Sequence, residues 1–195
     1  MTATREETVR SYLGDLISVL EHVSQAVVKQ AGNDDFRRIA HAGSVIDKLH
    51  SVLTRQRADL EAHVKAMGGT NGGGVLKDML GTVSGALAGL YGKVRGETAA
   101  RMLRDDYTAV SFVTACTSML HTTALALDDS ATAALTLRHL QEYPPLTMAL
   151  SELLPHAVVA DLAADKIPVG NASAAEEAIS NLNDAWHGAS AANPT

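Results

Sequence analysis

Several side chains of the types that bind transition metals lie in or beside the apolar segments of this chain. Carboxylates can bridge two metal ions, and imidazole nitrogens can fill the terminal positions of such a pair. Asp47 and His50 have an Asp-x-x-His spacing, which puts both groups on neighbouring turns of one helix face. If a metal binds, we expect iron or manganese, and the candidate ligands are Glu21, His22, Asp47, His50, His121 and His139.

No other reactive group has the sequence surroundings of a catalytic residue. Cys116, the only cysteine, lies among apolar and hydroxyl residues, where a thiol is usually an inert packing group. A single cysteine also excludes an intrachain disulfide, which suits a reducing cytoplasm. The glycine-rich stretch 68–74 lacks the lysine and the preceding strand of a phosphate loop. The net charge of −6 and the scattered lysines and arginines argue against nucleic acid as a partner.

The most apolar stretch, residues 107–127, carries no formal charge. A helix that is apolar on all sides is either the centre of a bundle or a membrane span. Its seven serine and threonine hydroxyls favour the bundle, because in lipid each would need a partner. We therefore expect a soluble, cytoplasmic, all-α protein with this helix at its centre. His121, alone on this helix, is read first as a hydrogen-bonded core histidine and second as a ligand.

Two helices should precede this central one. Apolar residues recur every three or four positions from about 5 to 30 and again from about 39 to 67. Thr4 and Glu7 have the spacing of a capping box, and residues 33–35 offer caps for the second helix. Gln56 and His63 fall on the apolar seam of the second helix, which is a first indication of chemistry inside the bundle. The simpler interpretation is that they lie near the helix end or are hydrogen-bonded within the core.

The fourth helix should begin at Asp129 or Ser130 and be interrupted at Pro144 and Pro145, which lack amide donors. Beyond residue 167 we expect a linker, a short helix and a flexible end from residue 188. Ser173 and Glu176 have capping-box spacing before that helix, and Trp186 should dock it on the bundle. The predicted domain is thus residues 1–167, with an appended segment at 168–195.

An additional helix at about 75–94 is unusual because Gly81, Gly85 and Gly89 recur every four residues. Glycine inside a helix costs up to ~1 kcal/mol relative to alanine. The spacing therefore indicates close contact with another helix, an amphipathic segment on a membrane or partner, or a loosely ordered connection. A homodimer through this groove is favoured over membrane contact, because Lys77 and Lys93 supply little basic surface.

Two helix pairs joined by a long link are the layout of ferritin-like proteins. The stretches 12–27 and 50–69 resemble the opening helices of the YciE/YciF-type ferritin-like family, bacterial proteins associated with stress conditions. His50, Thr54 and Gly68 match that family's second helix. The later stretches LRDDYTAV, MLHTTALAL and LRHLQEYPPL resemble a divergent branch of it. The resemblance spans about residues 8–165 and implies an antiparallel four-helix bundle, here with the glycine-spaced helix between helices 2 and 3 and a short C-terminal helix.

A ferritin-like dimetal site needs one carboxylate from each of two helices and a Glu-x-x-His from each of the other two. The central helix has no acidic residue between Asp106 and Asp128. In the fourth helix, His139 and Glu142 stand in reverse order, and Thr136 occupies the position of the expected carboxylate. The dimetal site is therefore predicted to be degenerate.

We expect a non-enzymatic, ferritin-like stress-associated or binding protein that needs no cofactor. One alternative is a metal-binding oxidase or iron-handling protein with a His-rich site, built from His22, His50, His121 and His139. Another is a membrane-surface or partner-binding helical module that uses residues 75–93.

Overall fold

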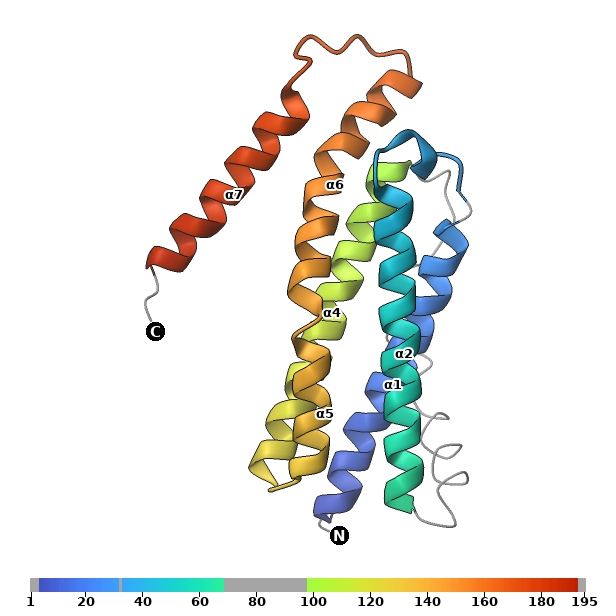
Figure 1. Cartoon of the computed structure of the whole chain (residues 1–195), viewed down its shortest axis with the longest axis vertical. Coiled ribbons are helices and arrows are strands. Elements are labelled where there is room, and N and C mark those ends of the chain that lie inside the picture. Colours follow the sequence, from blue (N-terminus) through green and yellow to red (C-terminus); the bar gives the residue numbers. More distant parts are fainter. Residues whose placement is uncertain (1–3, 32, 69–97, 193–195) are drawn as a thin grey trace.

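The computed structural model describes residues 4–31, 33–68 and 98–192, and within these residues every regular element is helical (Figure 1). The all-α prediction is confirmed for this part of the chain. The glycine-spaced helix predicted at 75–94 lies outside the described residues, so that helix and its dimer groove stay predictions.

The first helix, α1 (Arg5–Ala31), has the predicted capping box. The Thr4 amide donates to Oε2 of Glu7 (2.7 Å), and the Glu7 amide donates to Oγ1 of Thr4 (3.2 Å). These two bonds satisfy free amides at the start of the helix, as the T-x-x-E spacing predicts.

The prediction that residues 33–35 cap the second helix is wrong. The Asn33 side chain instead accepts the Asp35 amide in a tight turn (2.9 Å), and a short 3-10 helix, η1 (Phe36–Arg38), follows. The second helix, α2 (Ala42–Gly68), begins only after His41, which has a positive φ of 67°. Ile39 therefore lies outside α2, although its side chain is buried in the core.

The central helix α4 (Ala99–Ala126) is followed by α5 (Ser130–Leu140) and α6 (Tyr143–Ala164). Thr98 stands at the N-cap of α4 but makes no side-chain cap hydrogen bond. Asp129 caps α5 as predicted, accepting the Thr132 amide at 3.0 Å. The predicted break at Pro144 and Pro145 is confirmed. Both prolines lie in the first turn of α6, where a missing amide costs nothing.

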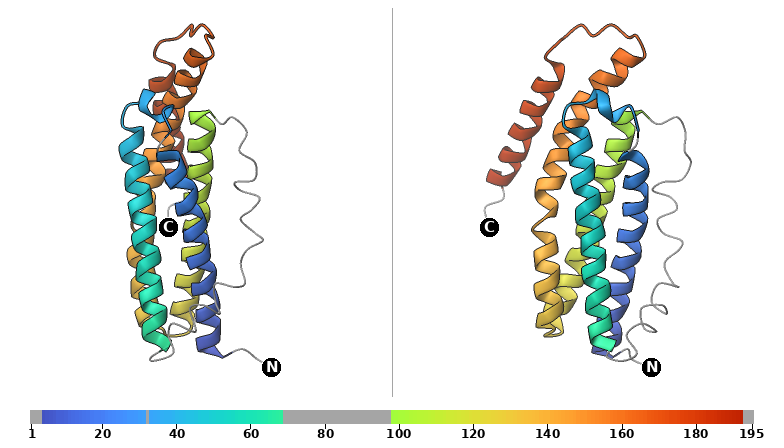
Figure 2. Two further views of the ribbon diagram at one scale, coloured as in Figure 1. Left: turned by 90° about the vertical axis from the view of Figure 1, so that its right-hand side faces the viewer. Right: turned by 45° about the vertical axis from the view of Figure 1, so that its right-hand side comes forward.

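These helices form a bundle of two antiparallel pairs (Figures 1 and 2). In one pair α1 packs on α2, and in the other α4 packs on α5 and α6, which together make one broken rod. The pairs meet where α1 contacts α4 and where α2 contacts α5 and α6. Because α2 and α4 run in the same direction, the end of α2 and the start of α4 lie at opposite ends of the bundle.

The core is mainly aliphatic and draws on every helix of the bundle. By length and composition alone, α4 and the joined rod 130–164 could each cross a membrane. A third of the most apolar window of α4 (33%) and 28% of that of the rod are buried inside the bundle. Core helices of soluble bundles pass the same test, so this finding leaves the predicted cytoplasmic location untested.

The last helix, α7 (Ala174–Ala192), packs against α6 after an exposed linker. The predicted Ser173–Glu176 capping box is wrong, because Oγ of Ser173 donates to Glu177 (3.2 Å) and to Asn171 (3.0 Å). Residues 188–192, expected to be flexible, continue the helix. Their alanines favour helix more than the sequence interpretation allowed.

Candidate functional site

The structure places the predicted metal ligands of α1 and of the start of α2 away from the core. The Glu21 carboxylate lies 3.6 Å from the Arg57 guanidinium, and exposed His22 directs Nδ1 to the Ser18 carbonyl (2.8 Å). Asp47 is exposed, and Nε2 of His50 lies 3.4 Å from the Thr54 hydroxyl. Asp47 and His50 therefore do not point together into the core as the Asp-x-x-His spacing had suggested.

The two remaining candidates, His121 of α4 and His139 of α5, each have their own hydrogen-bond partners. Nδ1 of His121 is 3.0 Å from Oγ1 of Thr136, so this histidine is hydrogen-bonded as the simpler interpretation predicted. His139 is buried, and its Nε2 lies 3.4 Å from Oδ2 of Asp59. Among the described residues, no three histidine, cysteine, aspartate or glutamate side chains are grouped as a metal site requires.

A hydrogen-bonded polar layer crosses the centre of the bundle instead. The Tyr143 hydroxyl donates to Oε1 of Gln56 (2.6 Å) and lies 3.1 Å from the Thr117 hydroxyl. Nε2 of Gln56 donates to Oε2 of Glu142 (2.9 Å), whose other oxygen pairs with Arg55. These hydrogen bonds satisfy the buried polar groups, as folded proteins require. The prediction that Gln56 is hydrogen-bonded within the core is thus confirmed.

A second polar chain continues this layer toward the α4–α5 turn. His63 directs Nε2 to the Thr132 hydroxyl (2.8 Å), which in turn donates to Oδ2 of Asp129 (2.6 Å). Burial lowers the pKa of His63, and it also lowers the pKa of His139, which lies deeper in the core. The Asp59 carboxylate opposes this effect at His139. Both imidazoles are therefore held toward the neutral form.

Asp106 is a buried carboxyl that the sequence interpretation missed. It is fully buried in α4, and neither of its oxygens has a hydrogen-bond partner among the described residues. Burial raises its pKa to about 8, while the nearby Gln30 side chain acts to lower it. Oε1 of Gln30 is likewise buried without a partner. The signal was present, because Asp106 has helical spacing to the core residues Leu103 and Val110.

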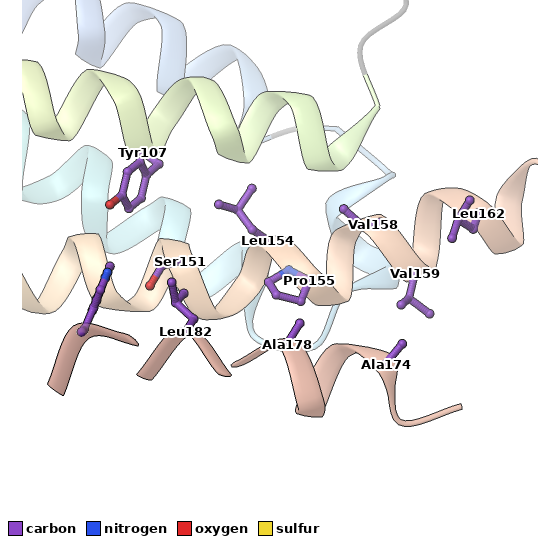
Figure 3. A pocket seen from close by; sticks show the side chains of 11 residues that line it. Tyr107, Ser151, Leu154, Pro155, Val158, Val159, Leu162, Ala174, Ala178 and Leu182 are labelled. Atoms are coloured by element: carbon purple, nitrogen blue, oxygen red, sulfur yellow. The ribbon is translucent and has the colours of Figure 1, made fainter. Parts of the chain in front are cut away.

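A largely apolar cleft of about 580 Å³ separates α6 from α7 (Figure 3). It exists because α7 slopes away from α6 toward its own C-terminal end (Figure 1). The Trp186 side chain is half-buried and lines this cleft, and its docking on the bundle stays a prediction. The lining residues are Tyr107 of α4; Ser151, Leu154, Pro155, Val158, Val159 and Leu162 of α6; and Ala174, Ala178, Leu182 and Trp186 of α7.

A second cavity, of about 770 Å³, lies on the α2 side of α6. Its walls are more polar, because Arg38 and His41 face Glu152 and His156 across it. Ile179 of α7 reaches this cavity, so the apolar face of α7 divides between the two sides of α6.

No family model, curated protein or solved structure matches this chain. The ferritin-like family membership expected from the resemblance therefore stays a prediction. Two features of the described residues bear on function: the polar layer, in which Gln56, Tyr143 and Thr117 hydrogen-bond to one another, and the cleft, which leaves apolar surface uncovered.

Proposed function

We propose that this protein is a non-enzymatic binding protein with a ferritin-like order of helices, and that its ligand site is the cleft between α6 and α7. The observation that carries the proposal is the cleft itself. Its volume of about 580 Å³ falls within the ~300–1,000 Å³ typical of small-molecule sites. Such sites are likewise mostly apolar, with a few polar groups.

The helix directions support the ferritin-like part of the proposal. Two antiparallel pairs in which the second and third rods run the same way match the bundles with one long crossover. The polar layer supports a degenerate dimetal site, because the neutral side chains of Gln56, Tyr143 and Thr117 hydrogen-bond to one another, whereas a dimetal protein uses inward-facing carboxylates. A role under stress conditions is proposed on the resemblance alone.

The chemistry of the cleft supports binding over catalysis. Its polar groups are the hydroxyls of Tyr107 and Ser151 and the indole of Trp186. Among the described residues, no carboxylate, imidazole or thiol belongs to its lining, so no described group there is suited to take a proton near neutral pH. Oγ of Ser151 donates to the Met148 carbonyl (2.7 Å), and the described lining offers no base to make it a nucleophile.

An uncharged fluorescent probe tests the proposal. N-phenyl-1-naphthylamine should bind saturably, with one site per chain, and should accept excitation energy from Trp186, the only tryptophan. A fluorescence increase that stays linear with probe concentration, or one without energy transfer from Trp186, would contradict a site in this cleft.

A further inference from the structure

The cleft is an elongated channel lined by one row of residues from each of two helices. On α6 the residues Leu154, Val158 and Leu162 recur every four positions. On α7 the facing row does the same over twelve residues, which at 1.5 Å rise per residue is about 18 Å. That row consists of Ala174, Ala178, Leu182 and Trp186. The cleft is therefore shaped for a narrow, extended apolar chain.

The two ends of the channel differ in polarity. Figure 3 shows Tyr107 and Ser151 near one end, with Leu182 opposite Ser151. Toward the other end, Ala174 lies opposite Val159, and Leu162 lies beyond it. The hydrogen-bonding groups thus gather at the end nearer the C-terminus of α7, where a ligand's polar head would lie.

The charges around the channel decide what kind of head can lie there. Among the described residues, no charged side chain lines the cleft, so a charged head of either sign would find no counter-charge there. Burying an unpaired carboxylate or ammonium is costly. Residues 161–192, which include α7 and the end of α6, carry one lysine, Lys166, against five carboxylates, at Asp161, Asp165, Glu176, Glu177 and Asp184. The net negative charge of this segment disfavours an anion further, though exposed charges contribute little individually.

We infer that the cleft binds an extended apolar chain whose head group is uncharged and discriminates against the anionic head of a fatty acid. The inference rests on the proposed binding function and adds the class of ligand. Dispersion and apolar burial along the two rows hold the chain, and the absence of a buried cation sets the selectivity.

A head-group series of constant chain length tests this selectivity. Decan-1-ol, decyltrimethylammonium and decanoate are each used at pH 7.5 to displace bound N-phenyl-1-naphthylamine from the full chain. We expect the alcohol to bind at least about tenfold more tightly than decanoate, which corresponds to ~1.4 kcal/mol, and more tightly than the ammonium, which likewise finds no counter-charge in the lining. Equal affinity for decanoate, or no displacement by any of the three, overturns the inference but leaves the binding function standing. Failure of the probe itself to bind overturns the proposed function.

A positive charge added to the lining provides a second test. Val158 is 48% exposed on the cleft wall, so a lysine there can keep its ammonium in water while its stem lines the channel. Val158→Lys should tighten decanoate binding about tenfold. Ser180→Lys, an exposed position away from the lining, adds the same charge as a control and should leave decanoate binding unchanged. An unchanged affinity in Val158→Lys, or equal tightening in both variants, contradicts the inference.

Vesicles of zwitterionic phosphatidylcholine distinguish binding of a single apolar chain in the cleft from binding of the protein to a membrane surface. We expect no shift in Trp186 emission on their addition. A shift that decan-1-ol does not compete away would assign the apolar surface to a lipid bilayer and overturn the inference.

Discussion

The Tyr143 hydroxyl donates a 2.6 Å hydrogen bond to Oε1 of Gln56, and both side chains are fully buried at the centre of the bundle. This bond joins α2 to α6 through neutral groups. The amide of Gln56 then reaches Glu142 (2.9 Å) and so links the buried layer to the Arg55 ion pair at its edge. The polar groups of this layer hold the helix pairs together.

Tyr143→Phe should lower the free energy of unfolding by about 1–3 kcal/mol, because Oε1 of Gln56 is left buried without a donor. Urea unfolding at pH 7.5 measures the change. Tyr12→Phe is the control, since the half-buried Tyr12 makes no hydrogen bond among the described residues. Gln56→Leu introduced into Tyr143→Phe should recover part of the loss. Equal stability of Tyr143→Phe and the native chain would show that the bond contributes nothing.

Asp106→Asn should stabilise the protein at pH 8 and have little effect at pH 4. The pKa of Asp106 rises from 3.8 to about 8 on folding, so the folded state keeps a proton that the unfolded state loses. Its contribution to stability is complete below pH 3.8 and is lost as the pH rises through about 8. At 1.4 kcal/mol per pKa unit, the loss is on the order of 5 kcal/mol.

The difference in unfolding free energy between Asp106→Asn and the native chain, followed by urea unfolding from pH 4 to 8, isolates this group. The amide of an asparagine would also offer a donor to the unpartnered Oε1 of Gln30. A difference that does not grow with pH would mean that Asp106 is ionised in the fold.

His139 has the opposite pH dependence. Burial lowers its pKa, so below pH 6.5 the unfolded chain takes up a proton that the folded chain resists. Its contribution to stability is therefore lost as the pH falls. His139→Gln should be less sensitive than the native chain to a change from pH 7.5 to 5.0, measured by urea unfolding. The exposed substitution His22→Gln should leave that sensitivity unaltered.

The helices of the bundle could be predicted because apolar periodicity is a local property of the sequence. The break at Pro144 and the cap at Asp129 follow from single residues, and the structure confirms both. The cap expected at Asp35 fails because the Asn33 side chain forms a competing turn. Such competition between neighbouring polar groups cannot be read from spacing alone.

The candidate site was less predictable. Asp106 directly precedes the uncharged stretch 107–127, although its spacing to Leu103 and Val110 places it on the core face. The cleft could not be predicted, because the apolar pattern of Leu182 and Trp186 indicates only that α7 packs against the bundle. The angle between α6 and α7 depends on the conformation of the linker, including the positive φ of 58° at Lys166.

Protein purified without an affinity tag should contain no stoichiometric iron or manganese when analysed by inductively coupled plasma mass spectrometry. The predicted ligands Glu21, His50 and His139 make separate contacts with Arg57, Thr54 and Asp59. About two metal ions per chain, the number held by dimetal carboxylate proteins, with ferroxidase turnover would contradict this prediction. In that case His50→Ala combined with His139→Ala identifies whether these histidines hold the metal.

The dissociation constant of N-phenyl-1-naphthylamine for two matched variants of α7 tests most directly that the cleft is the ligand site. Ala178→Phe places a ring in the lining, whereas Ser180→Phe places the same ring at an exposed position two residues away. With both variants shown to be folded by circular dichroism, we predict binding at least about tenfold weaker in Ala178→Phe and native affinity in Ser180→Phe. Equal affinity in the two variants would contradict the assignment of the cleft as the binding site.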